Sequence, residues 1–119
     1  MFSAMNGALL PDRVTDLLGK PTPGLVTGLL YDVIDPELGV NIVDLGLLRD
    51  VEVDAEGNVT VVMTLTTPGC PLGGYLEGEI EAAVRQLPAA REVRVELVWD
   101  PPWHPDQMTD AAREQLGWW

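Results

Sequence analysis

The sequence contains a single cysteine and a single histidine among its 119 residues. One cysteine excludes a disulfide within the chain and a zinc site built from several cysteines of one chain. It also excludes an iron-sulfur cluster held by the thiolates of one chain alone, because such a cluster needs about four ligands. Any cluster would have to be shared between chains, completed by other ligands, or held transiently.

Basic side chains are also scarce. Seven lysines and arginines stand against 19 acidic residues, which gives a formal net charge of −12. This surface would repel a phosphate backbone, so we expect no binding of nucleic acid. The acidic surface is either simply solvated, or it prefers basic partners and metal cations.

Long apolar runs are missing as well, and none approaches the roughly 18 residues needed to span a bilayer. The start of the sequence, Met1 to Met5, has no basic region and no long apolar core, so we expect no secretory signal. We therefore expect no membrane association and a cytoplasmic location, with which one unpaired thiol is compatible.

The length and the 46% hydrophobic content suit one compact domain. Residues 1–21, with Asn6-Gly7 and Gly19-Lys20-Pro21, are expected to form a variable and partly flexible lead-in. Within it, the apolar pattern allows a short helix over about 9–18. Residues 22–119 are expected to form a single domain.

The rest of the sequence alternates between the apolar periods of helices and strands. The first helix begins with Thr22 as N-cap and Pro23 at its first position, and we expect Pro36 to end it. The full set of expected elements is helices over 22–34, 71–87 and 109–116 and strands over 47–54, 58–66 and 91–99.

Apolar periodicity also predicts which side chains face the core. The first helix is expected to bury Val33 and Ile34 as part of its stripe. The second strand alternates strictly, and the third is expected to carry Trp99 on its inner face. The two alternating sets of the second strand are Val59, Val61, Met63 and Leu65 against Thr60, Val62, Thr64 and Thr66.

The order of elements is α-β-β-α-β-α. The first two strands are joined by a short Gly-containing connector, which indicates an antiparallel hairpin. The third strand follows a helix and is expected to run parallel to one of them. We therefore predict an α+β fold, a compact two-layer sandwich with a small three-stranded mixed sheet and helices packed on one face.

Cys70 is the leading candidate for chemistry. It stands in Pro68-Gly69-Cys70-Pro71, at or just before the start of the expected second helix. Unpaired N–H groups and the positive end of the helix dipole favour a thiolate there, whereas the acidic residues of the same helix oppose it. The alternative is a half-buried small residue that fills a turn.

The sequence offers few further candidates. Asp35, Glu37 and Asp44 could ligate a hard cation, or they could accept bonds from backbone N–H groups in turns, which we favour for Asp35 and Glu37. His104 is either a solvated side chain or a second ligand, if its loop folds back on Cys70.

The aromatic residues and the missing motifs bear on activity. Trp99 and Trp103 are expected to pack the terminal segment against the core, and Trp118 and Trp119, if exposed, indicate a protein contact. A phosphate-binding loop, a dinucleotide fingerprint and a Gly-x-Ser-x-Gly elbow are all absent, which weakens an enzyme interpretation.

Several sequence blocks together resemble the SufT/PaaD-like metal-sulfur cluster assembly family, with the SufT-like branch favoured. The branch is indicated by the block around Trp103, and the Cys-rich tail of the PaaD branch is missing. The blocks keep the family's order and cover about residues 22–117. They are Tyr31-Asp32-Val33-Ile34-Asp35-Pro36-Glu37-Leu38-Gly39, Asn41-Ile42-Val43-Asp44-Leu45-Gly46-Leu47, Met63-Thr64-Leu65-Thr66-Thr67-Pro68-Gly69-Cys70-Pro71, Val98-Trp99-Asp100-Pro101-Pro102-Trp103 and the segment 108–117.

The resemblance implies a non-enzymatic accessory factor in iron-sulfur cluster assembly or delivery. It implies Cys70 as a ligand of iron or a transient cluster, with none tightly bound by a single chain, and it supports Asp44 in the same site. His104 is the third candidate ligand. Expected partners are iron-sulfur assembly proteins and client apoproteins, and a symmetric homodimer would bring two Cys70 thiolates together.

Two alternatives remain open at this point. In the first, the chain is a non-catalytic protein-interaction module with a structural Cys70 and a Trp-rich docking tail. In the second, it is a thiol-dependent enzyme such as a hydrolase or reductase, which would need a thiol pKa below the ordinary value of about 8.5.

Overall fold

The computed structural model describes residues 21–66 and 72–117. The predictions for the lead-in, for Cys70 and its turn, and for Trp118 and Trp119 lie outside these residues. In chain order the elements are α2 (Pro23–Leu30), β1 (Leu48–Val53), β2 (Val59–Met63), α3 (Leu72–Val84), β3 (Val93–Leu97), the 3₁₀ helix η1 (Pro105–Gln107) and α4 (Asp110–Leu116).

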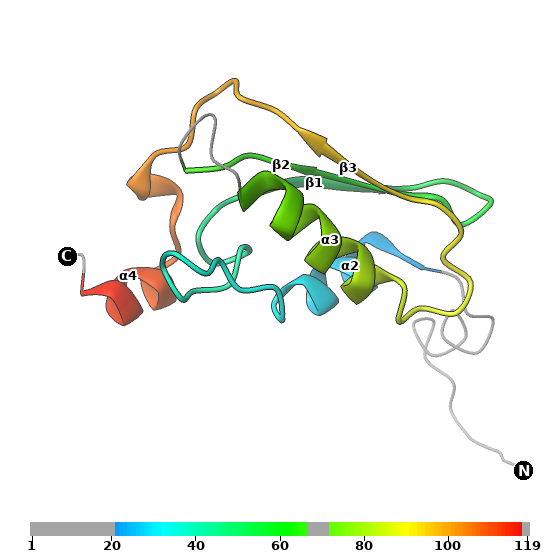
Figure 1. Ribbon diagram of the computed structural model, residues 1–119, viewed down its shortest axis with the longest axis horizontal. Coiled ribbons are helices and arrows are strands. Elements are labelled where there is room, and N and C mark those ends of the chain that lie inside the picture. The colour runs from blue at the N-terminus through cyan, green and yellow to red at the C-terminus, as the bar shows by residue number, and fades with distance from the viewer. Residues whose placement is uncertain (1–20, 67–71, 118–119) are drawn as a thin grey trace, which may run out of the picture.

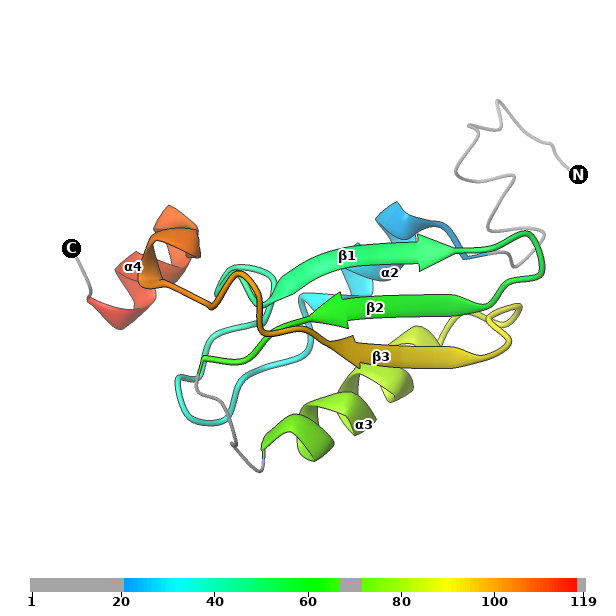
Figure 2. The same ribbon diagram turned by 90° about the horizontal axis from the view of Figure 1, so that it is seen from above.

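The sheet has three strands in the order β1-β2-β3. β1 and β2 pair antiparallel, with Val51 opposite Val61, and β2 and β3 pair parallel, with Val61 opposite Val95. The helices α2 and α3 lie on the same face of this sheet, and α4 lies at one end of the molecule (Figures 1 and 2). The predicted α+β fold with a mixed sheet is therefore confirmed.

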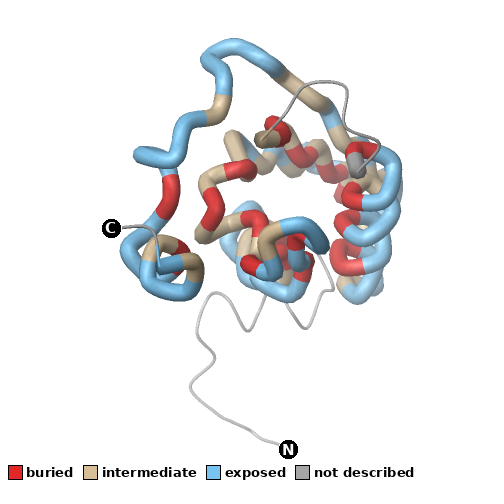
Figure 3. The backbone as a smooth tube through the Cα atoms, turned by 60° about the vertical axis from the view of Figure 1, so that its left-hand side comes forward, coloured by how far each residue is buried: buried red, intermediate tan, exposed pale blue. Residues whose placement is uncertain are grey.

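The core lies between the sheet and these two helices, where the buried segments of Figure 3 face one another. β2 is the central strand and buries every second residue, as its alternation predicts. The largest fully buried side chains are Leu30, Ile42, Leu45, Leu47, Met63, Leu76, Ile80, Val26, Val33, Val40, Val59 and Val61. None of the helices in the described ranges is long and apolar enough to cross a membrane.

The hairpin between β1 and β2 turns at Asp54–Asn58. Asn58 donates to the Asp54 carboxylate from its side-chain amide at 2.9 Å and from its backbone N–H at 3.0 Å. These bonds hold the pKa of Asp54 below its ordinary value, the side-chain bond contributing most. The hairpin thus carries an ionised carboxylate just past the end of β1.

The first helix is shorter than predicted. Its N-terminus is confirmed, since the Thr22 hydroxyl accepts from Leu25 N–H at 3.1 Å. The helix ends at Leu30 rather than at residue 34, because Ile34 forms an isolated β-bridge with Asn41. Ile34 is consequently 44% exposed, and its predicted place in the core is wrong, whereas Val33 is buried as predicted.

The ends of other elements also differ from prediction. β3 runs over Val93–Leu97 and not over 91–99. β2 ends at Met63 rather than at residue 66, so the period of two stops there and Thr64 is fully buried instead of facing outward. α3 ends at Val84, before the expected end at residue 87, because Leu87 N–H bonds the Val84 carbonyl in a tighter turn.

The last helix agrees with its prediction. The Thr109 hydroxyl accepts from Ala112 N–H at 3.3 Å and forms the N-cap of α4. Gly117 ends the helix in the left-handed conformation, with φ of 72°. Since α4 lies away from the sheet, its place depends on the loops described next (Figure 2).

Candidate functional site

Asp44 lies in a tight turn, residues 41–46, which leads into β1. The Asn41 side chain holds it from two directions: Oδ1 accepts from Asp44 N–H at 2.8 Å, and Nδ2 donates to Asp44 Oδ2 at 2.8 Å. This pairing of residues three apart uses the preference of Asn for bonding nearby backbone. It fixes the backbone and one carboxylate oxygen of Asp44 together.

The segment 103–109 closes over this turn from far along the chain. The Thr109 hydroxyl donates to Asp44 Oδ1 at 3.1 Å, and Thr109 N–H donates to the Asp44 carbonyl at 2.9 Å. The Trp103 indole N–H donates to the Leu45 carbonyl at 2.7 Å. The predicted packing of Trp103 against the core is thereby confirmed, whereas Trp99 is 42% exposed and its predicted inner position is wrong.

Gly46 makes this close approach feasible. Its φ is 81°, and a Cβ added there would lie 2.5 Å from the Gln107 carbonyl oxygen. Any side chain would therefore both strain the backbone and push the C-terminal segment away. The turn and the segment that covers it depend on the absence of a side chain at this one position.

The Asp44 carboxylate keeps capacity for a further ligand. Within residues 21–66 and 72–117, each of its oxygens accepts one hydrogen bond, Oδ2 from Asn41 and Oδ1 from Thr109. An ionised carboxylate offers about four lone-pair sites. The two bonds orient the group and leave oxygen lone pairs for a cation or a donor.

Asp35 serves its own turn. Its Oδ1 accepts from Glu37 N–H at 2.8 Å and from Leu38 N–H at 3.2 Å, and the residue is 2% exposed. The structural interpretation favoured for Asp35 is therefore confirmed. Glu37 contributes its backbone N–H to this turn, and its residue is exposed.

His104 begins the 3₁₀ helix η1. Its Nδ1 accepts from Asp106 N–H at 3.1 Å, and its side chain is 66% exposed. A nitrogen that accepts this bond carries no proton, so the 3.4 Å contact between Nδ1 and Asp106 Oδ2 is not an ion pair in this state. His104 is adjacent in sequence to Trp103, which anchors its loop on Leu45.

No three His, Cys, Asp or Glu side chains lie close enough to hold a metal ion within residues 21–66 and 72–117. A metal site that uses Asp44 would need ligands from elsewhere. Cys70, the first candidate for such a ligand, lies outside the described residues. The assignment of Cys70, Asp44 and His104 as ligands stays a prediction.

Thr64 is a feature that the sequence interpretation missed. It is fully buried directly after β2, and its hydroxyl finds no hydrogen-bond partner in the described parts of the chain. A buried hydroxyl without a partner costs about 1–3 kcal/mol. The alternation of β2 predicts that Thr64 faces outward, so the local sequence pattern gives no indication that its hydroxyl is buried.

The family of the chain follows from a match over residues 25–97 to the model of the family described as "Iron-sulfur cluster assembly protein". The chain belongs to the iron-sulfur cluster assembly protein family. The matched range includes the turn that holds Asp44, and in sequence it includes Cys70. The resemblance stated from the sequence blocks is thereby confirmed.

Individual members of the iron-sulfur cluster assembly protein family agree with this assignment. The chain is 45% identical over 92 residues to "Fe-S protein maturation auxiliary factor YitW" of Bacillus subtilis, covering 77% of this chain and 90% of that protein. It is 46% identical over 85 residues to "Fe-S protein maturation auxiliary factor SufT" of Staphylococcus aureus, covering 71% and 97%. The SufT-like branch is thus supported by similarity along nearly the whole length of both relatives.

A solved structure supports the fold. A crystal structure described as a domain of unknown function from Bacillus anthracis superposes with a TM-score of 0.77 at 38% identity. The superposition covers 80% of this chain and 91% of that one. The two-layer arrangement is therefore shared with that domain.

Proposed function

We propose that this chain is an accessory factor that helps assemble iron-sulfur clusters or deliver them to client proteins, with Cys70 as a transient ligand. The iron or cluster is cargo and not a resident cofactor. The observation that carries the proposal is the family match over residues 25–97, which includes both Cys70 and Asp44. The names of the relatives, auxiliary factors of iron-sulfur protein maturation, agree with it.

A small number of ligands suits a protein that carries a cluster transiently better than a protein that holds one permanently. A stable cluster takes about four protein ligands, and one chain offers one thiolate. A metal binds the deprotonated thiol outright, so Cys70 needs no strongly lowered pKa to serve as ligand. Cargo with an incomplete ligand set is easily transferred to a client that offers more thiolates.

Asp44 is proposed as the neighbouring oxygen ligand or acceptor. Its carboxylate is oriented by Asn41 and Thr109 while lone pairs stay available. His104 is proposed as a third ligand through Nε2, which requires that its ring proton move to Nδ1; Nδ1 would then donate to Asp106 Oδ2, 3.4 Å away, instead of accepting from Asp106 N–H. A symmetric pair of chains would double each of these groups.

The proposed partners are iron-sulfur assembly proteins and client apoproteins. A thiol that must stay reduced fits a reducing compartment, so we place the role in the cytoplasm. This role requires that the chain bind cargo and transfer it. It does not require the chain to catalyse a covalent change in a substrate. We therefore propose a non-enzymatic factor.

Transfer of cargo to an apoenzyme tests this proposal. The wild-type chain, loaded with ferrous iron and sulfide without oxygen, is expected to restore activity to an apo iron-sulfur enzyme. An equally treated Cys70→Ser chain is expected to restore at least about tenfold less, because loss of even an outer partner of a ligand costs 10–100-fold in affinity. An Asp44→Asn chain is expected to lie between the two.

The controls distinguish the alternative function. An Asp32→Asn chain, changed at an exposed carboxylate, should match the wild type. Equal transfer by the wild-type and Cys70→Ser chains would contradict the proposal. It would favour an interaction module with a structural Cys70, for which the exposed indole of Trp99 is the specific support.

A further inference from the structure

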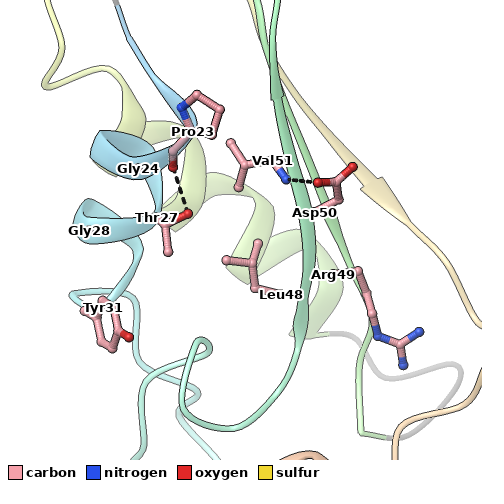
Figure 4. A pocket seen from close by; sticks show the side chains of 9 residues that line it. All are labelled: Pro23, Gly24, Thr27, Gly28, Tyr31, Leu48, Arg49, Asp50 and Val51. Carbon is pink, nitrogen blue, oxygen red and sulfur yellow. Dashed lines mark hydrogen bonds between the residues drawn. The ribbon is translucent and has the colours of Figure 1, made fainter. Parts of the chain in front are cut away.

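A groove of about 560 Å³ lies between α2 and the outer edge of β1 (Figure 4). The residues that line it do not include those of the turn of Asp44, residues 41–46. The helix contributes Pro23, Gly24, Thr27, Gly28 and Tyr31, and the strand contributes Leu48, Arg49, Asp50 and Val51.

The edge of β1 offers unpaired backbone groups to this groove. Within the described ranges β1 pairs with β2 alone, at the end of the sheet order. Asp54 N–H bonds the Asn58 carbonyl, so these two residues form a hydrogen-bonded pair of the antiparallel ladder. Hydrogen-bonded and non-bonded pairs alternate along such a ladder, which makes Val53 and Val51 members of non-bonded pairs. Their N–H and C=O groups therefore point away from β2. Among the described residues, the partner of Val51 N–H is the carboxylate of the preceding side chain, Asp50 Oδ1, at 2.9 Å (Figure 4).

The helix side of the groove permits a close approach. Gly24 and Gly28 are one turn apart on α2, and a Cβ added to either would meet nothing within 4 Å. Tyr31, 47% exposed, stands at the end of this glycine-lined surface (Figure 4). An added backbone beside β1 would find open space here and an aromatic ring to contact.

The groove also continues along the strand. A second hollow of about 470 Å³ shares Leu48 and Arg49 with the first and reaches Gly46, Pro101 and Gln107. The Arg49 guanidinium bonds the Pro101 carbonyl at 2.7 Å, so this cation is already engaged within the chain. The two hollows together follow the outer edge of β1, as an extended ligand would.

The geometry points to strand addition: β1 and α2 form a docking groove for an extended, basic peptide segment of a partner protein. The segment would pair with Val51 and Val53, and its carbonyl would replace Asp50 Oδ1 on Val51 N–H. Lysine or arginine side chains of the segment would then meet the displaced Asp50 carboxylate and the exposed carboxylates of Glu52 and Asp54.

Charge excludes a second copy of this chain as the occupant. Two-fold pairing across the edge must match outward-pointing residues with one another. Val51 against Val51 places Asp50 opposite Glu52, and Val51 against Val53 places Glu52 opposite itself. Like charges directly opposite destabilise a strand pair, and each chain carries a net charge of −12.

A synthetic peptide of four Val-Lys repeats, capped at both ends, tests the proposal by titration calorimetry. The full chain is expected to bind it, and a Gly28→Leu chain at least tenfold more weakly, because the new side chain fills the groove. Gly78→Leu is the matched control: Gly78 is also an exposed helical glycine with open space around its Cβ, but it lies on α3. Replacing glycine by leucine raises the helix propensity at both positions, so unfolding of the variant cannot explain a loss of peptide binding.

Hydrogen exchange locates the binding. The peptide is expected to slow exchange of the Val51 and Val53 amides, and a peptide of Val-Glu repeats is expected to leave them unchanged. Equal affinity in the Gly28→Leu and wild-type chains would overturn the proposal, as would equal binding of the Val-Glu peptide. Protection of both amides in the peptide-free chain would also overturn it, because the edge would then already be paired. Since Cys70 takes no part, these outcomes are independent of the cargo-transfer assay.

Discussion

A Cys70→Ser chain is expected to fail in restoring iron-sulfur enzyme activity to a bacterial strain that lacks its own factor of this family. Cys70 is the one thiol of the chain, and serine offers a hard oxygen that stays protonated near neutral pH. The expected loss is roughly a hundredfold relative to wild type, since even outer-shell changes around a metal cost 10–100-fold. The measurement is the activity of several iron-sulfur enzymes in extracts, normalised to the amount of each enzyme.

A second substitution at the same position separates a ligand from a filler of space. Cys70→Ala removes every donor atom and is expected to fail as Cys70→Ser does. The amount of factor in each strain, measured with an antibody, controls for loss of the protein. Full activity with Cys70→Ala at wild-type protein levels would contradict a ligand role.

Gly46→Ala is expected to cause the largest loss of stability among glycine substitutions in the site. The left-handed φ of 81° costs an alanine about 1–2 kcal/mol. The added Cβ would also lie 2.5 Å from the Gln107 carbonyl oxygen, which is backbone and can move only with its segment. We expect a loss of roughly 3 kcal/mol or more in the free energy of unfolding, measured by urea denaturation.

Gly39→Ala is the matched control for that experiment. Gly39 has a similar φ of 72°, but a Cβ there would meet nothing within 4 Å. Its loss is expected to be the backbone contribution alone, about 1–2 kcal/mol. Equal losses for the two substitutions would contradict the close packing of residues 103–109 on the turn of Asp44.

Local chemistry made much of the fold predictable. The N-cap at Thr22 follows from the residue and its immediate neighbours, and the structure confirms it. The caps of α4 at Thr109 and Gly117 are equally local features. The antiparallel hairpin and the parallel third strand follow from connection lengths. These features need no knowledge of distant contacts.

Contacts between distant residues explain the errors. Ile34 leaves its expected helix because it pairs with Asn41 across a loop, a choice that helical periodicity cannot reveal. In the candidate site, the Asn41–Asp44 pair is local and its spacing could have indicated it. The Thr109–Asp44 bond joins residues 65 apart and carries no local signal.

The central claim is that Cys70 holds iron-sulfur cargo, and counting the iron and sulfide bound per chain tests it most directly. Wild-type, Cys70→Ser and Asp32→Asn chains would be incubated without oxygen with ferrous iron and sulfide, and then freed of unbound ions. We predict bound iron with sulfur-to-iron absorbance in the wild-type and Asp32→Asn chains and neither in Cys70→Ser. Equal iron and the same absorbance in all three chains would contradict the account.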